Sequence, residues 1–142
     1  MSILTSILAA CAGGRPNNLG VRNGRLMDCP GSPNCIASQT LDKGHRIAAL
    51  AFSEEPATAF ARLKQILVGR RDTAIIEERP DYLRVEFHTT LFIDDGEFLL
   101  DGDHRLVQVR SASRLGYSDL GKNRSRLEEI RRQFVDSATN NL

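Results

Sequence analysis

The sequence predicts an α+β fold, a two-layer sandwich in which an antiparallel sheet of about five strands carries two helices on one face. Two observations lead to this prediction. Alternating apolar and polar residues, typical of strands, fill the middle of the chain, and apolar residues at helical spacing lie on either side of them. The order β-α-β-β-β-β-α places both helices against the same face, and a length of 142 residues suits one domain.

The first predicted strand is the short apolar run of residues 46–52, and a helix follows it. Ser53 is the predicted N-cap, and Pro56 in the first turn loses no hydrogen bond there. Three apolar residues then recur at helical spacing: Phe60, Leu63 and Leu67. Gly69 is expected to end this helix.

The two-residue period predicts a strand over 82–88, and three neighbouring runs are predicted as further strands: 73–78, 97–100 and 105–111. Asp101-Gly102-Asp103 is typical of a hairpin turn between the last two strands. A second amphipathic helix is predicted over 122–138, with one apolar stripe: Leu127, Ile130 and Phe134.

Residues 1–18 are interpreted as an anchor and tether, 19–138 as the folded domain and 139–142 as a disordered tail. The apolar start of the chain leads through Leu8-Ala9-Ala10 to Cys11, which is similar to a bacterial lipoprotein signal. In such signals the Cys thiol carries a lipid with fatty acids such as palmitate, which holds the protein on a membrane in the periplasm. No Lys or Arg precedes the apolar stretch, so the alternative is a disordered terminus on a cytoplasmic protein.

Cys29 and Cys35 enclose five residues, two of them Pro and one Gly. Such a stiff loop can bring the two sulfur atoms within bonding distance, and export would favour the disulfide. Two free thiols or half of a metal site are the alternatives. The three histidines lack metal-ligand spacing, so we expect neither a metal nor another cofactor: His45, His88 and His104.

The charge balance, 19 Lys and Arg against 18 Asp and Glu, provides no global attraction to nucleic acid. Arginines of the last helix are interleaved with Glu128 and Glu129, so nucleic acid is not an expected partner. No apolar run reaches the ~20 residues that span a bilayer.

The segment from Arg110 to Arg124 is polar and punctuated by glycine. It leads into the N-terminus of the last helix, where free N–H groups and nearby Arg and Lys side chains could receive an anion. In the alternative, structural interpretation, Ser118 or Asp119 caps the helix and the arginines pair with Asp94, Asp95 or Glu97.

Three separated motifs resemble a bacterial family, the domain of unknown function 1499. They are Cys29-Pro-Gly-Ser-Pro-Asn-Cys35, Phe92-Ile-Asp-Asp-Gly-Glu-Phe98, and Arg110-Ser-Ala-Ser-Arg114 with Gly116-Tyr-Ser-Asp-Leu-Gly-Lys-Asn-Arg124. The resemblance implies an exported or membrane-anchored protein and carries no established activity. The motifs map onto the following residues: Ser32, Asn34, Asp94, Asp95, Glu97, Arg110, Ser111, Ser113, Arg114, Ser118, Asp119, Asn123 and Arg124.

The leading hypothesis is a non-catalytic binding or scaffolding domain, anchored through Cys11, that recognises an anionic small molecule, lipid headgroup or partner protein through residues 110–124. The candidate ligand-binding residues are Asn34, Asp94, Asp95, Arg110, Ser111, Ser113, Arg114, Ser118, Asp119, Asn123 and Arg124. The rival hypothesis is a hydrolase or transferase that uses a serine and a carboxylate of residues 94–124. The chain has no Gly-x-Ser-x-Gly motif, and both His88 and His104 are expected at the surface.

Overall fold

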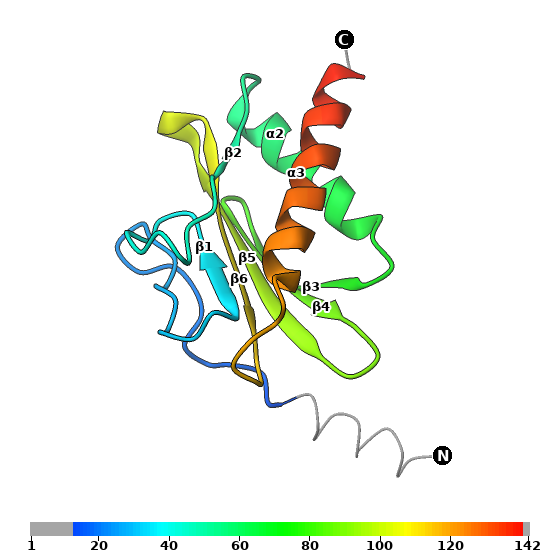
Figure 1. Cartoon of the computed structure of the whole chain (residues 1–142). Coiled ribbons are helices and arrows are strands. Elements are labelled where there is room, and N and C mark those ends of the chain that lie inside the picture. The colour runs from blue at the N-terminus through cyan, green and yellow to red at the C-terminus, as the bar shows by residue number, and fades with distance from the viewer. Residues whose placement is uncertain (1–12, 141–142) are drawn as a thin grey trace.

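The computed structural model describes residues 13–140, which form a six-stranded antiparallel sheet with two helices on one face (Figure 1). The predicted fold class is confirmed. The strands are β1 (Cys35–Ala37), β2 (Leu50–Ala51), β3 (Thr73–Arg79), β4 (Tyr82–His88), β5 (Ile93–Asp101) and β6 (Leu106–Ser113). The helices are α2 (Pro56–Val68) and α3 (Lys122–Thr139), and a 3-10 turn (Gly102–His104) joins β5 to β6.

The strands lie in the order β1-β6-β5-β4-β3. β2 lies on the same side of β6 as β1: β1 pairs with residues 110–112 of β6, and β2 pairs with residues 106–107. Residues 46–52 were predicted as one strand, but only Leu50–Ala51 pairs with β6. The preceding part of that edge is occupied by β1, whose three residues are too few to show a period in the sequence.

Helix α2 begins later than the sequence predicted. Glu55, not Ser53, occupies the N-cap position, and its side chain makes no capping hydrogen bond. Pro56 does stand at the helix start as expected, since its missing N–H has no partner in the first turn. Gly69 is the C-cap residue, but its φ of −73° is one that any residue adopts.

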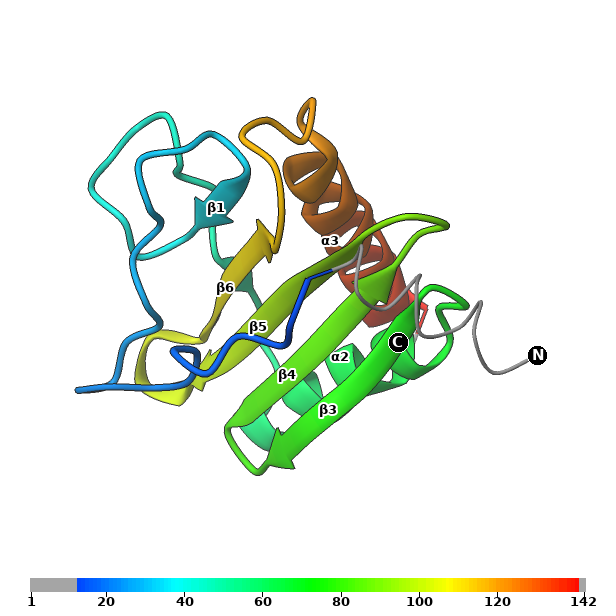
Figure 2. The same ribbon diagram turned by 90° about the horizontal axis from the view of Figure 1, so that it is seen from below.

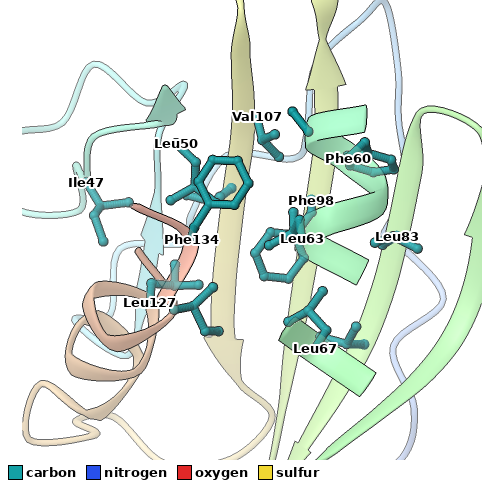
Figure 3. Packing of buried hydrophobic residues seen from close by; sticks show 14 of the residues in the cluster. Ile47, Leu50, Phe60, Leu63, Leu67, Leu83, Phe98, Val107, Leu127 and Phe134 are labelled. Carbon is teal, nitrogen blue, oxygen red and sulfur yellow. The ribbon is translucent and has the colours of Figure 1, made fainter. Parts of the chain in front are cut away.

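Both helices pack on the face of the sheet that carries the alternating apolar residues of β4 and β6. Figure 3 shows Leu63 and Leu67 of α2 and Leu127 and Phe134 of α3 directed toward the strands, with Phe98 between them. All five side chains are at most 1% exposed. Burial of this magnitude provides most of the free energy of folding.

Gly96 lies in the middle of β5 because Phe87 of β4 packs across it. A Cβ atom at this position would lie 2.5 Å from Phe87 Cε2 and 2.9 Å from Val85 Cγ2. Glycine within a strand often marks such a close approach. β5 itself starts at Ile93 instead of the predicted Glu97, since the acidic residues before Gly96 are paired inside the fold instead of solvated.

The second face of the sheet is covered by residues 13–26, which we call the cover segment. We expected residues 12–18 to be a tether, yet Arg84 of β4 donates to the carbonyl oxygen of Pro16, and the Gly20 N–H donates to Glu97 of β5. Figure 2 shows this dark-blue segment lying across β4 and β5. Cys11 lies outside the described residues. At the other end α3 continues to Thr139, into the predicted tail.

Candidate functional site

The residues predicted as a site are divided between the two faces of the sheet. Successive side chains of a strand point to opposite faces. Ser111 and Ser113 of β6 face α3, where both are hydrogen-bonded to Asn123. Arg110 and Arg114 lie on the opposite face, among carboxylates of β4 and β5. The residues therefore form two clusters with the sheet between them.

Arg114 is the centre of an ion-pair cluster that also contains Arg15, Glu86 and Asp95. Its Nε and Nη2 atoms donate to the two Asp95 oxygens, each at 2.9 Å, and Nη2 also donates to Glu86 Oε2 at 2.6 Å. Arg15 Nε donates to the same Glu86 oxygen at 2.7 Å. The side chains of Arg114, Glu86 and Asp95 are only 6%, 5% and 3% exposed. The guanidinium group of Arg114 is therefore occupied by carboxylates of the protein itself.

Glu86 is held in its ionised form in this cluster. Burial opposes the negative charge on Glu86, but hydrogen bonds from Arg15 and Arg114 outweigh it and lower the pKa of Glu86 to about 2. The hydrogen bonds to Asp95 and Glu86 in turn raise the pKa of Arg114. Charged partners in this geometry form the stronger class of hydrogen bond.

Arg110 is also turned toward a carboxylate of the protein. Its Nη1 atom lies 3.7 Å from Glu97 Oε2, and the other oxygen of Glu97 accepts from Tyr82 Oη and from the Gly20 N–H. Burial lowers the pKa of Arg110, while burial and the bond to Glu97 raise that of Tyr82. The structural interpretation of Arg110 and Arg114 thus agrees with the geometry. The sequence did not indicate Arg15, because the cover segment reads as a tether.

Asn123, at the start of α3, joins the helix to the sheet. Its side chain is fully buried, accepts from Ser111 Oγ at 2.6 Å and donates to Ser113 Oγ at 3.0 Å and Asp119 Oδ2 at 2.7 Å. A further contact reaches the Asn34 carbonyl oxygen at 3.4 Å. The side chains of Ser111, Ser113 and Asp119, all predicted site residues, therefore have a hydrogen-bond partner in Asn123.

Asp119 occupies the place where an anion would bind at the N-terminus of α3. Its two oxygens accept from the backbone N–H groups of Gly121 and Asn123 at 2.8 and 3.0 Å. Burial opposes ionisation, but the hydrogen bonds from Asn123 and Gly121 outweigh it and lower the pKa of Asp119. The helix N-terminus is therefore neutralised by a carboxylate of the chain.

Asp94, the neighbour of Asp95 in β5, is paired on the helix side. Arg126 of α3 donates to Asp94 Oδ2 at 2.9 Å, and its guanidinium carbon lies 4.6 Å from the centre of the Phe87 ring. Both charged side chains are 5% exposed. Arg126 is not part of the predicted apolar stripe of this helix, so the sequence did not indicate that its side chain is buried.

A cavity of about 360 Å³ opens at the end of the sheet, between the β4–β5 turn and the segment that joins β6 to α3. We call it the end pocket. Part of its lining is apolar, from Phe92, Leu115 and Leu120. The rest is polar: Thr89, Asp94, Ser113, Ser118, Asp119 and Lys122. Four of the predicted site residues are thus brought together here.

Among the contacts of residues 13–140, three polar groups of the end pocket keep a hydrogen to donate. Ser113 Oγ accepts from Asn123, and Ser118 Oγ accepts from the Leu120 N–H, so each hydroxyl keeps its own hydrogen. Lys122 is exposed and contributes an ammonium group. Asp94 and Asp119 are already paired with groups of the protein.

The two remaining predicted residues support loops. Asn34 donates to the Gly116 carbonyl oxygen at 2.7 Å and so holds the segment beside the end pocket. Arg124 donates to the Arg46 carbonyl oxygen at 2.9 Å. The predicted disulfide is present: Cys29 and Cys35 are bonded, with their Cα atoms 5.6 Å apart.

Within residues 13–140, no serine hydroxyl is hydrogen-bonded to a histidine ring or to a carboxylate. His88 and His104 have side chains 46% and 74% exposed, whereas His45 is buried with Nδ1 at 2.8 Å from the Cys35 carbonyl oxygen. The same residues contain no group of three or more His, Cys, Asp or Glu side chains placed to hold a metal ion. Nor does the described part of the chain contain a helix long and apolar enough to span a membrane.

The comparison with protein families gives one match. The model described as "Protein of unknown function (DUF1499)" matches residues 25–134, which include the end pocket and both clusters except Arg15. Neither a curated protein nor a solved structure matches the chain.

Proposed function

The chain belongs to the DUF1499 family of proteins of unknown function, and we propose that it is a non-catalytic binding domain held at a membrane surface outside the cytoplasm. Its ligand is an amphipathic molecule with an oxygen-rich headgroup, taken up in the end pocket. The observation that carries the proposal is the composition of that pocket, in which unused hydrogen-bond donors stand beside apolar side chains.

The hydrogen-bond donors of the end pocket indicate which chemical class of ligand it binds. Ser113, Ser118 and Lys122 offer hydrogens and no free negative charge, so they favour phosphate or hydroxyl oxygens. Phe92, Leu115 and Leu120 favour an apolar portion of the same molecule. A lipid headgroup with the first part of its acyl chains combines both properties.

Arg110 and Arg114 have no part in this recognition. Each faces a carboxylate of the sheet and is at most 6% exposed, beneath the cover segment. A buried arginine that is already paired binds a further anion only if its existing ion pair breaks.

Two features of the chain support the location. The Cys29–Cys35 disulfide is typical of an oxidising compartment. Leu8-Ala9-Ala10-Cys11 resembles a lipidation motif, and the carbonyl oxygen of Gly13, only two residues beyond Cys11, already accepts from Arg114 of the folded domain.

Ligand binding is tested with the full chain and a short-chain phosphatidylglycerol, kept below its micelle concentration and titrated by calorimetry. The variant Ser118→Ala/Lys122→Gln removes two exposed donors of the end pocket. We expect it to bind at least about tenfold more weakly than the parent chain, since each lost bond to a charged group costs about 1.5 kcal/mol or more.

The matched control is Ser53→Ala/Lys43→Gln, which removes the same two residue types at exposed positions outside the end pocket. This control is expected to keep the parent affinity. Equal affinity of the pocket variant and the control would refute the assignment of the end pocket.

Lipidation is tested by mass spectrometry of the chain purified from the membrane fraction of a bacterial host. We expect a diacylglyceryl adduct on Cys11, and we expect Cys11→Ser to move the chain to the soluble periplasmic fraction. An unmodified Cys11 in a chain that accumulates in the cytoplasm would contradict the proposed anchor.

A further inference from the structure

Exposed apolar side chains are concentrated at the end of the sheet where the end pocket opens. Eight large hydrophobic residues are exposed in the described part of the chain, and five of them lie in the two segments that border this pocket. We call these five the apolar rim: Leu91, Phe92, Leu115, Tyr117 and Leu120. Soluble domains seldom gather exposed apolar residues in one place unless that place binds something.

Leu120, a member of the apolar rim, is both exposed and in an unfavourable backbone conformation. Its side chain is 96% exposed, and its φ of 56° lies in the left-handed region, which is unfavourable for a leucine. Tyr117 in the same segment is 73% exposed. Neither residue contributes to the core, so the packing of the domain gives no reason for an apolar side chain at either position.

We infer that the apolar rim inserts into the surface of a lipid bilayer and thereby directs the mouth of the end pocket at the membrane. The inference deepens the proposed function, because it states from where the ligand enters. The occupant of the rim is lipid.

The start of the described chain lies at this same end. Figure 1 shows the dark-blue residues beginning beside the loop between β6 and α3. Gly13 has a φ of 81°, and a Cβ atom there would lie 3.2 Å from Leu115 Cδ2. Residues 11–13 span about 7 Å at most. A lipid attached to Cys11 therefore holds Leu115 close to the headgroup layer.

The chemistry of the rim suits an interface between lipid and water. A tyrosine with its apolar ring and polar hydroxyl is favoured at headgroup level, and the exposed Lys122 of the end pocket pairs with lipid phosphate. Asp119 is the one acidic residue of the segment 115–122, and its carboxylate is engaged with backbone amides. No unpaired negative charge of this segment therefore opposes an anionic membrane.

Insertion is tested by fluorescence, since the chain contains no tryptophan. Phe92→Trp places a single reporter in the rim, and Val135→Trp places one at the far end of α3, at 53% and 55% exposed positions. The full chain is mixed with phosphatidylcholine–phosphatidylglycerol vesicles whose acyl chains carry bromine. We expect a blue-shifted, strongly quenched emission from residue 92 and an unchanged emission from residue 135. Unquenched emission from residue 92, or equal quenching of both reporters, overturns the inference.

A second variant separates membrane docking from ligand binding. Leu91 and Tyr117 belong to the rim but do not line the end pocket. In a Cys11→Ser background, Leu91→Ser/Tyr117→Ser is expected to lower vesicle partitioning at least about tenfold, because it removes two large apolar side chains that the bilayer would bury. Val68→Ser/Val135→Ser, which removes exposed apolar residues outside the rim, is expected to partition like its parent.

The two proposals fail in different ways. Loss of partitioning with unchanged affinity for the soluble short-chain lipid confirms docking by the rim as a property separate from the pocket. Unchanged partitioning of Leu91→Ser/Tyr117→Ser refutes docking whatever the pocket binds. Failure of the soluble lipid to bind any variant refutes the proposed ligand, while the quenching from residue 92 still decides the docking.

Discussion

Arg114 and Asp95 form a bidentate ion pair on the face of the sheet opposite the helices, with both nitrogen–oxygen distances at 2.9 Å. The pair joins the end of β6 to β5 beneath the cover segment, and Glu86 of β4 shares the same guanidinium group. Three strands are thus tied by one arginine. Charged groups buried to this degree stabilise a fold only as long as each has its partner.

Arg114→Ala is therefore expected to destabilise the domain by about 3 kcal/mol or more, because it leaves Asp95 without its buried partner. Chemical denaturation of the full chain measures the change in the free energy of unfolding. Arg124→Ala is the control, since Arg124 makes one bond at the surface, and it is expected to cost no more than about 0.5 kcal/mol. Similar losses for the two variants would contradict a structural role that is special to Arg114.

Glu86 predicts how stability depends on pH. Its pKa is lowered from 4.5 to about 2 in the folded chain, so its stabilising effect is complete above pH 4.5 and is lost as the pH falls toward 2. The difference in unfolding free energy between the parent and Glu86→Gln is expected to be largest near neutral pH. It should shrink by about 2 to 3 kcal/mol on acidification.

Other carboxylates titrate in the same range, and His88 Nε2 lies 3.3 Å from Glu86 Oε1. The comparison with Glu86→Gln cancels their direct contribution. Arg15→Ala provides a second check: it removes one donor to Glu86 and should shift the acid loss of stability to higher pH. A gap between parent and Glu86→Gln that stays constant down to pH 2 would show that Glu86 is not held in its charged form.

The helices and the longer strands could be predicted from their periods, whereas the short strand β1 and the arrangement of the site could not. Arg110 to Arg114 alternate with two serines, and the two-residue period would have assigned them to opposite faces if β6 had been predicted to reach Ser113. The sequence instead predicts a strand that ends at Ser111, with the following residues in the polar segment that leads into the last helix.

The pairing of Glu86 was harder to foresee. Its position on the polar face of β4 predicts a solvated side chain, but Arg114 and the cover segment lie against it. That segment is rich in Gly, Pro and Asn, so nothing in its local pattern indicates that it packs on a sheet. Contacts between residues about 70 positions apart in the chain have no local signal.

Asn123→Leu is expected to destabilise the domain by about 2 to 4 kcal/mol, because Ser111 and Asp119 each lose a hydrogen bond in a buried site. Thermal unfolding with circular dichroism detects the loss. Ser125→Leu, at an exposed position on the same helix, controls for the change in residue type. Equal unfolding temperatures for the two variants would show that the Asn123 bonds contribute little.

The Cys29–Cys35 disulfide closes a short loop next to β1. Replacing both residues with Ser is expected to cost about 2 kcal/mol, since a loop of this size restricts the unfolded chain only modestly. A reductant added to the parent chain should lower the unfolding temperature to that of the double variant and should leave the variant unaffected. An unfolding temperature of the parent that does not respond to full reduction would contradict this contribution.

Leu120 allows stability and membrane docking to be separated at one residue. Asparagine tolerates a left-handed backbone better than leucine, and Asn23 of this chain adopts nearly the same φ, 55° against 56°. Because Leu120 is 96% exposed, its replacement removes no core contact. Leu120→Asn is therefore expected to raise the free energy of unfolding by about 0.5 to 1 kcal/mol while it weakens partitioning into vesicles.

Denaturation and vesicle sedimentation of the same preparation measure both effects. Val135→Asn, in which the apolar residue stands on a helix far from the rim, should change stability slightly and partitioning not at all. If Leu120→Asn stabilises the chain and partitions like the parent, the strained leucine has no role at the membrane, and the apolar rim loses its most exposed member.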